Sequence, residues 1–238
     1  LVMRIAEIMA SQNIADKIHF LGYLAEREED FVLVESLLPY LKTEKNSEVL
    51  SNLIYAISSL GCEDKYFHFQ SFLNSDEPLL VYTTIKCLIT EHHFRIIPSV
   101  EKLIATANLD SNFHAEIMLL VMPYLVTEKE PQALRAMQLL AKGGSRTQLY
   151  FAKGLKFWNP SNAILMREIQ SLFLNSSDLD CLTKCADYLG DSMSGEMLVG
   201  KVDFLLKKVT HSESKSCLNK LRLDAEKKQL EESKDRVI

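Results

Sequence analysis

Residues 46–61, which read NSEVLSNLIYAISSLG, decide the fold class of this chain. Their apolar residues recur at steps of 4, 3, 1 and 3, which places them on one face of a helix. These residues are Val49, Leu53, Ala56, Ile57 and Leu60. Asn46 or Ser47 can cap the start of the helix, and Gly61 can end it. The stretch therefore predicts one amphipathic helix with a polar residue at its start and a glycine at its end.

The same pattern returns along the chain at a nearly constant interval. Helices of this kind are expected to start near Asn13, Val49, Leu80, Phe113, Leu149, Cys181 and Glu213. The successive intervals are 36, 31, 33, 36, 32 and 32 residues, and each interval holds one further amphipathic helix. The sequence therefore predicts a helical hairpin of about 33 residues that is repeated six or seven times.

The intervening helices complete an all-helical pattern. They are expected at 30–41, 65–73, 99–107, 131–142, 162–174 and 196–209. No run of residues alternates with period two between Asn-Gly or Asp-Gly turns, so strands are not expected. The chain of 238 residues has only 8 Gly and 6 Pro, whereas the tight turns of sheet-rich domains need more of both. The expected fold class is all-α.

Three segments resemble the second helix of a HEAT repeat, a unit of the armadillo-like helical repeat class. They are 46–61, 75–88 (SDEPLLVYTTIKCL) and 177–190 (SDLDCLTKCADYLG). In that family an acidic or proline turn precedes an apolar residue, then small residues, then Leu-Gly. The resemblance covers most of the chain and implies an α-α superhelix (solenoid) of six to seven hairpins over residues 1–223. Tetratricopeptide repeats have a similar period, but their Trp, Gly-Tyr and Pro signature is not kept.

Two segments are expected to depart from the repeats. Residues 142–146 read KGGSR, and their glycines predict a helix stop, a tight turn and a hinge. A phosphate-binding loop is the alternative for this segment, but it lacks the Walker pattern and does not follow a strand. Residues 224–238 are nearly all charged and predict an exposed C-terminal helix or a linker.

The resemblance also implies where a partner would bind, because stacked second helices line the concave side of a HEAT array. The positions expected to face outward there are Asn52, Tyr55, Thr83, Lys86, Glu116, Lys184 and Asp187. The expected function is a non-enzymatic scaffold for a protein or peptide partner, within a larger protein. The alternatives are a regulatory module of a signalling or membrane-associated protein and a HEAT-like enzyme that processes nucleic acid.

Composition narrows the classes of partner and compartment. The net charge of −5 argues against nucleic acid, because neutralising phosphates requires excess Lys and Arg. No apolar stretch reaches the length of a membrane span. Five cysteines, mostly in apolar helical patterns, predict free thiols and a reducing compartment, and hence a cytoplasmic location. The first residue is Leu1, so we expect a longer parent chain.

No catalytic, metal-binding or cofactor-binding residue is expected. Cys181 and Cys185 could form half of a metal site, but a buried seam is the favoured interpretation. His92 and His93 are expected at the end of a helix, where histidine interacts favourably with the helix dipole. A capping role is therefore favoured over a functional one. HEAT-like di-iron hydroxylases use His-Glu dipeptides, which this chain lacks. HEAT-like DNA glycosylases are basic, whereas this chain is acidic. The single tryptophan, Trp158, is expected to pack at the end of a helix. No catalytic residue can be assigned by similarity to phycobilin lyases.

Overall fold

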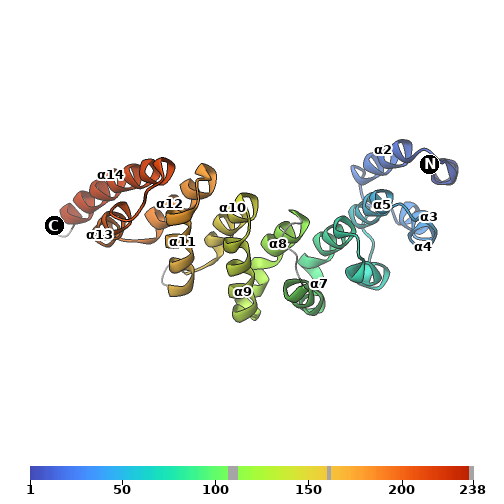
Figure 1. The fold of residues 1–238 in the computed structure, drawn as a ribbon. Coiled ribbons are helices and arrows are strands. Elements are labelled where there is room, and N and C mark those ends of the chain that lie inside the picture. The colour runs from blue at the N-terminus through green and yellow to red at the C-terminus, as the bar shows by residue number, and fades with distance from the viewer. Residues whose placement is uncertain (107–111, 160–161, 236–238) are drawn as a thin grey trace. The chain divides into compact units, whose positions relative to one another are not determined.

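The structure is a computed structural model that describes residues 1–106, 112–159 and 162–235. These residues form α-helices and two short 3-10 helices, and none of them lies in a strand. The chain is therefore all-α, as the sequence predicts. Contacts between residues divide it into two compact units, Leu1–Thr106 and Ala107–Ile238, which are coloured blue to green and green to red in Figure 1.

The first unit is organised around one central helix. Its elements are α1 (Val2–Ala10), α2 (Ile14–Ala25), α3 (Phe31–Leu37), α4 (Tyr40–Thr43), α5 (Ser47–Ser59), α6 (Lys65–Phe69), η1 (Gln70–Asn74) and α7 (Pro78–Thr106). Helix α5 packs against both α2 and α7, and α3 and α4 also contact it. Helix α1 contacts α2 and α3, whereas α6 and η1 pack against α7.

Helix α5 confirms the expectation for residues 46–61. Its five predicted core residues have no exposed surface: they are Val49, Leu53, Ala56, Ile57 and the C-cap residue Leu60. The Asn46 side chain accepts hydrogen bonds from the N–H groups of Glu48 and Val49, as an N-cap does. Gly61 has a φ of 85°, the left-handed conformation that ends many helices and that glycine adopts without strain.

The second unit contains two rows of helices. Its elements are α8 (Asn112–Glu128), α9 (Glu130–Lys142), α10 (Ser145–Gly154), η2 (Leu155–Phe157), α11 (Ala163–Asn175), α12 (Leu179–Ser192), α13 (Gly195–Leu206) and α14 (Ser212–Asp235). In one row α10 packs against α8 and α12, and α12 packs against α14. In the other row α9 contacts α11, and α11 contacts α13. From α8 to α12, each helix thus packs on the next helix but one, as in Figure 1.

Three of the expected intervening helices differ in detail. Residues 30–41 form two helices, because Pro39 has no N–H to donate to the hydrogen-bond ladder. Residues 65–73 begin as α6 and tighten into η1, as short helices often do at their C-terminal ends. The expected helix 99–107 starts earlier than predicted: α7 consists of two helices joined by a kink at His92, which has a non-helical conformation, and the second helix continues to Thr106. Ala107 lies outside the described residues.

The proposed hinge at 142–146 lies inside the second unit. Gly143 ends α9 and Gly144 precedes α10, and the Thr147 hydroxyl donates to the Gly144 carbonyl. A helix stop and a tight turn therefore account for the two glycines. The boundary between the compact units follows Thr106, and sequence patterns did not indicate it.

The charged C-terminal segment is continuous with the helix before it. Helix α14 crosses residue 224 without interruption, and Ala225 is fully buried. Lys228 Nζ donates to the carbonyls of Gly190 and Met193 at 2.9 and 2.7 Å. The Gly195 N–H donates to the Glu232 carboxylate at 3.1 Å. These charged residues therefore attach α14 to the connection between α12 and α13.

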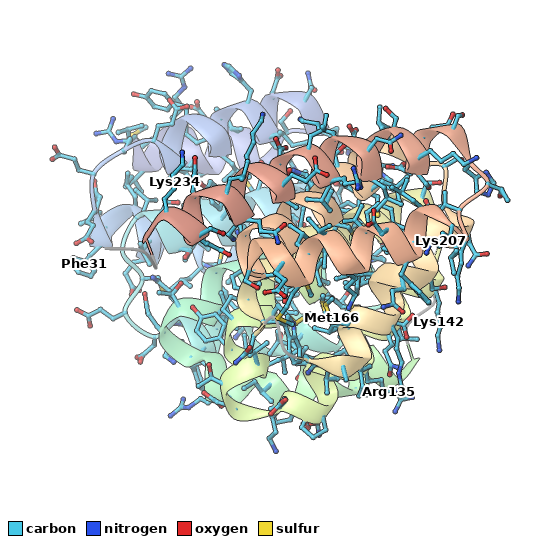
Figure 2. The ribbon with its side chains drawn as sticks, turned by 90° about the vertical axis from the view of Figure 1, so that its left-hand side faces the viewer. Phe31, Arg135, Lys142, Met166, Lys207 and Lys234 are labelled. Atoms are coloured by element: carbon cyan, nitrogen blue, oxygen red, sulfur yellow. The ribbon has the colours of Figure 1, made fainter. Side chains whose placement is uncertain are left out.

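Other charged residues of the second unit project into solvent at helix ends. Figure 2 shows Met166 among the packed helices, whereas Lys142, Lys207 and Lys234 point outward. These lysines lie at or next to the C-terminal ends of α9, α13 and α14. A cation in that position interacts favourably with the helix dipole and remains hydrated.

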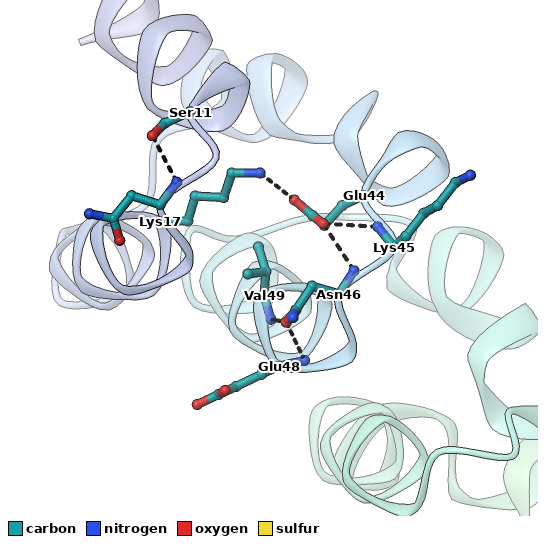
Figure 3. Close-up of polar contacts among 8 residues, drawn as sticks. Ser11, Lys17, Glu44, Lys45, Asn46, Glu48 and Val49 are labelled. Carbon is teal, nitrogen blue, oxygen red and sulfur yellow. Dashed lines mark hydrogen bonds and ion pairs between the residues drawn. The ribbon is translucent and has the colours of Figure 1, made fainter.

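A partly buried ion pair joins α2 to the connection between α4 and α5 in the first unit. Lys17 Nζ lies 2.7 Å from Glu44 Oε2, and each side chain is 12% exposed. The other Glu44 oxygen accepts hydrogen bonds from the N–H groups of Lys45 and Asn46 (Figure 3). Burial raises the pKa of Glu44, but the bonds from Lys17 and the two N–H groups outweigh burial and hold the pKa below 4.5.

We expect Glu44→Gln to lower the free energy of unfolding by about 1–2 kcal/mol near neutral pH, because the amide cannot pair with Lys17 as an ion. The pKa of Glu44 is lower in the folded state, so the stabilisation is present above 4.5 and is lost as the pH falls through the folded-state value. Urea unfolding of both proteins across this pH range should show their difference shrinking with acidification. A constant difference would contradict the ionic origin of the effect.

Candidate functional site

The structure brings four of the expected binding residues together in the first unit. A groove of about 350 Å³ lies between α5 and α7, and we call it the α5–α7 groove. It is lined by Glu48, Ser51, Asn52, Tyr55, Leu79, Tyr82, Thr83 and Lys86. Helical spacing places Asn52 and Tyr55 on one face of α5, and Thr83 and Lys86 on one face of α7. Because α5 and α7 pack side by side, the two faces meet along one seam.

An exposed aromatic ring and a cation lie at the mouth of the groove. Tyr55 is 45% exposed, and Lys86 Nζ lies 5.5 Å from the centroid of its ring. At this distance a lysine ammonium is attracted to the negative face of the ring, by about 0.5–1 kcal/mol at an exposed site. The Asn52 amide donates to the Glu48 carbonyl, so its oxygen is still able to accept a hydrogen bond. The mouth can therefore contact a peptide through stacking, charge and hydrogen bonds.

The floor of the groove contains a polar group without a partner. Ser51 is 4% exposed, and its Oγ makes no hydrogen bond among the described residues. A buried hydroxyl left unpaired costs about 1–3 kcal/mol, and native proteins usually pair such groups. A polar atom of a bound partner could recover this free energy.

Thr83 does not face outward as expected. Its exposure is 9%, and it helps to close the groove beneath Lys86. Thr83 lies one residue from the fully buried Thr84 and two from the buried Ile85, so it falls at the edge of the packed face of α7. Whether a residue at the edge of a helical face is buried depends on the neighbouring helix, and the spacing of residues along one helix does not show this.

A larger pocket adjoins the groove through a shared residue. It has a volume of about 890 Å³ and we call it the α1–α2 pocket. Arg4, Asp16, His19, Tyr23 and Glu26 are among its lining residues, and Asn52 lines both cavities. Sequence reasoning missed α2 as a contributor. The signal was available, because Asp16, His19, Tyr23 and Glu26 follow steps of 3, 4 and 3, opposite the buried residues of the helix.

The three expected binding residues of the second unit divide into two groups. Glu116 on α8 accepts a hydrogen bond from the Tyr150 hydroxyl on α10 at 2.7 Å, so it ties two helices together. Lys184 and Asp187 are exposed on α12 and line a separate pocket of about 580 Å³. Trp158 also lines this pocket, which we call the Trp158 pocket.

Four of the five cysteines are buried, and Cys87 is half-buried. All five are free, and Cys181, Cys185 and Cys217 are buried on α12 and α14. Hydrogen bonding to Cys181 and burial raise the pKa of Cys185 well above its ordinary value. The Cys181 thiol also donates to the Gln148 carbonyl on α10. The buried seam favoured from sequence is therefore present in the structure.

The described residues contain neither a metal-binding cluster nor a membrane-spanning helix. No group of three or more His, Cys, Asp and Glu side chains is arranged to hold a metal ion in residues 1–106, 112–159 and 162–235. Within the same ranges, every helix is too short or too polar to cross a bilayer.

Comparisons with known proteins add no family. No protein-family model, curated protein or solved structure matches this chain. The likeness to HEAT repeats therefore remains a resemblance in three sequence segments.

Proposed function

We propose that the chain is a non-enzymatic, HEAT-like scaffold that binds a protein or peptide partner in the α5–α7 groove. The repeat interval and the packing of alternate helices support an α-α superhelix, because one hairpin cannot bury both of its apolar faces alone. A rigid row of helices with a groove on one side suits docking of an extended or helical segment.

The observation that carries this proposal is the composition of the groove. Tyr55 offers an exposed aromatic surface, Lys86 offers a cation, and Ser51 has a buried hydroxyl without a partner. Tyrosine is enriched at protein interfaces because it combines contact area with a polar end. Asn52 extends the same surface into the α1–α2 pocket, so a partner could contact α2, α5 and α7 together.

Partner capture with the intact chain tests the proposal. We expect Tyr55→Ala and Lys86→Glu to weaken capture of the same partners by about tenfold or more, as interface anchors do. Captured proteins would be quantified by mass spectrometry against the wild-type chain.

Lys42→Glu is the matched control for this experiment. Lys42 is exposed on α4 and does not line the groove. Lys42→Glu changes the net charge by the same amount as Lys86→Glu. It should leave capture unchanged. If Tyr55→Ala and Lys86→Glu both retain every partner, the assignment of the groove is wrong.

A further inference from the structure

The Trp158 pocket in the second unit carries an excess of unpaired cations. Lys153 and Lys156 reach it from the end of α10 and from η2, and Lys184 reaches it from α12. All three are exposed, and none forms an ion pair with another described residue. Lys153 and Lys156 instead lie over the rings of Tyr150 and Phe157, at 5.0 and 4.8 Å. Three ammonium groups therefore surround one concavity without carboxylates bound to them.

The wall of the pocket contains an unpaired donor. Trp158 is 7% exposed, and its Nε1–H has no acceptor among the described residues. Tyr188 ties α12 to the backbone of Trp158, because its hydroxyl donates to the Trp158 carbonyl oxygen at 3.5 Å. The indole Nε1 is itself buried, so the three ammonium groups are the groups that a ligand in the pocket would contact. Carboxylate oxygens pair well with ammonium groups.

We infer that the Trp158 pocket binds an acidic peptide segment of a partner protein, whose carboxylates pair with Lys153, Lys156 and Lys184. The inference takes from the proposed function only that the chain binds proteins, and it concerns a different surface from the α5–α7 groove. Charge complementarity of this kind steers association and selects the partner.

Two carboxylates in the same pocket favour a peptide over a nucleic acid. Asp187 and Asp191 are exposed on α12, one and two turns beyond Lys184. The phosphates of a nucleic-acid backbone that crossed the pocket would come close to both aspartates and be repelled by their carboxylates. A peptide can place acidic residues beside the lysines and neutral residues beside the two aspartates. The net charge of −5 further disfavours nucleic acid.

The chain contains a built-in reporter of this pocket, because Trp158 is its single tryptophan. We would titrate the intact chain with a short peptide of alternating glutamate and glycine and follow the indole fluorescence. A saturable change in emission is expected, and it should weaken by about tenfold when NaCl is raised from about 0.05 to about 0.3 M. A matched lysine–glycine peptide should produce no saturable change.

Charge variants separate the pocket from general attraction. Lys156→Glu combined with Lys184→Glu should weaken binding of the glutamate peptide by about tenfold or more. Lys142→Glu combined with Lys234→Glu makes the same change in net charge outside the pocket, and should keep affinity within about twofold. Asp187→Asn combined with Asp191→Asn should strengthen binding, which keeps the test decisive if the lysine variant unfolds. Equal losses in both lysine variants, or tighter binding of single-stranded DNA of equal charge, would overturn the inference.

Discussion

Replacing Gly195 with alanine is expected to destabilise the second unit by about 3 kcal/mol or more, because α14 leaves no room for a side chain there. A Cβ at this position would lie 2.4 Å from the backbone nitrogen of Gln229, 2.6 Å from its Cα and 2.8 Å from the Ala225 carbonyl oxygen. These are backbone atoms of a helix, so they cannot move aside as a flexible side chain could. The helix itself would have to shift away from α13.

Helix α13, which contains Gly195, also provides the control. Gly200 lies inside α13, and a Cβ there would meet no atom within 4 Å. Gly200→Ala should therefore stabilise the protein by roughly 0.5–1 kcal/mol, since alanine favours the helix and restricts the unfolded chain. Urea unfolding followed by Trp158 fluorescence reports on this unit. Similar effects of the two substitutions would contradict the close packing of α13 on α14.

Replacing Phe69 with alanine is expected to destabilise the first unit by about 3–5 kcal/mol. Phe69 is the last residue of α6 and is fully buried in the unit where α6 and η1 pack on α7. Its removal takes apolar surface out of the core and leaves a cavity that the surrounding helices can fill only in part. Circular dichroism in urea would measure the change in the free energy of unfolding.

Phe67 is a matched control two residues away. It is 72% exposed on the same short helix, so Phe67→Ala removes the same side chain with little loss of burial. We expect its effect to stay within about 0.5 kcal/mol. If Phe67→Ala costs as much as Phe69→Ala, the orientation of α6 in this account is incorrect.

Elements defined by local signals were predicted well. The helix at 47–59 combines an Asn46 cap, a continuous apolar face and a glycine stop, and all three act within a few residues. Start positions separated by about 33 residues likewise located α2, α5, α7, α8, α10, α12 and α14. The break at Pro39 could have been predicted from the missing N–H, but the apolar residues on both sides suggested one helix.

Features that depend on distant residues were not predicted. Residues 224–238 were predicted to form an exposed helix or a linker, and residues 224–235 of this segment continue helix α14. The contact of Lys228 with the Gly190 carbonyl was not predicted, because it joins residues 38 positions apart in sequence. The boundary at Thr106 and the kink at His92 depend on packing and not on a composition change. Among the candidate binding residues, Asn52, Tyr55 and Lys86 were placed together because helical periodicity fixes a face. The hydrogen bond of Glu116 was not predicted, because its partner Tyr150 lies on another helix.

Hydrogen–deuterium exchange of the intact chain tests most directly the central claim that alternate helices pack in series within each unit. Amides of α5 and α12, which are packed between neighbouring helices, should exchange slowest in their units, whereas those of α1 should exchange fastest. Exchange of α5 and α12 that is as fast as that of α1 would contradict the packing, and with it the two binding surfaces that depend on it.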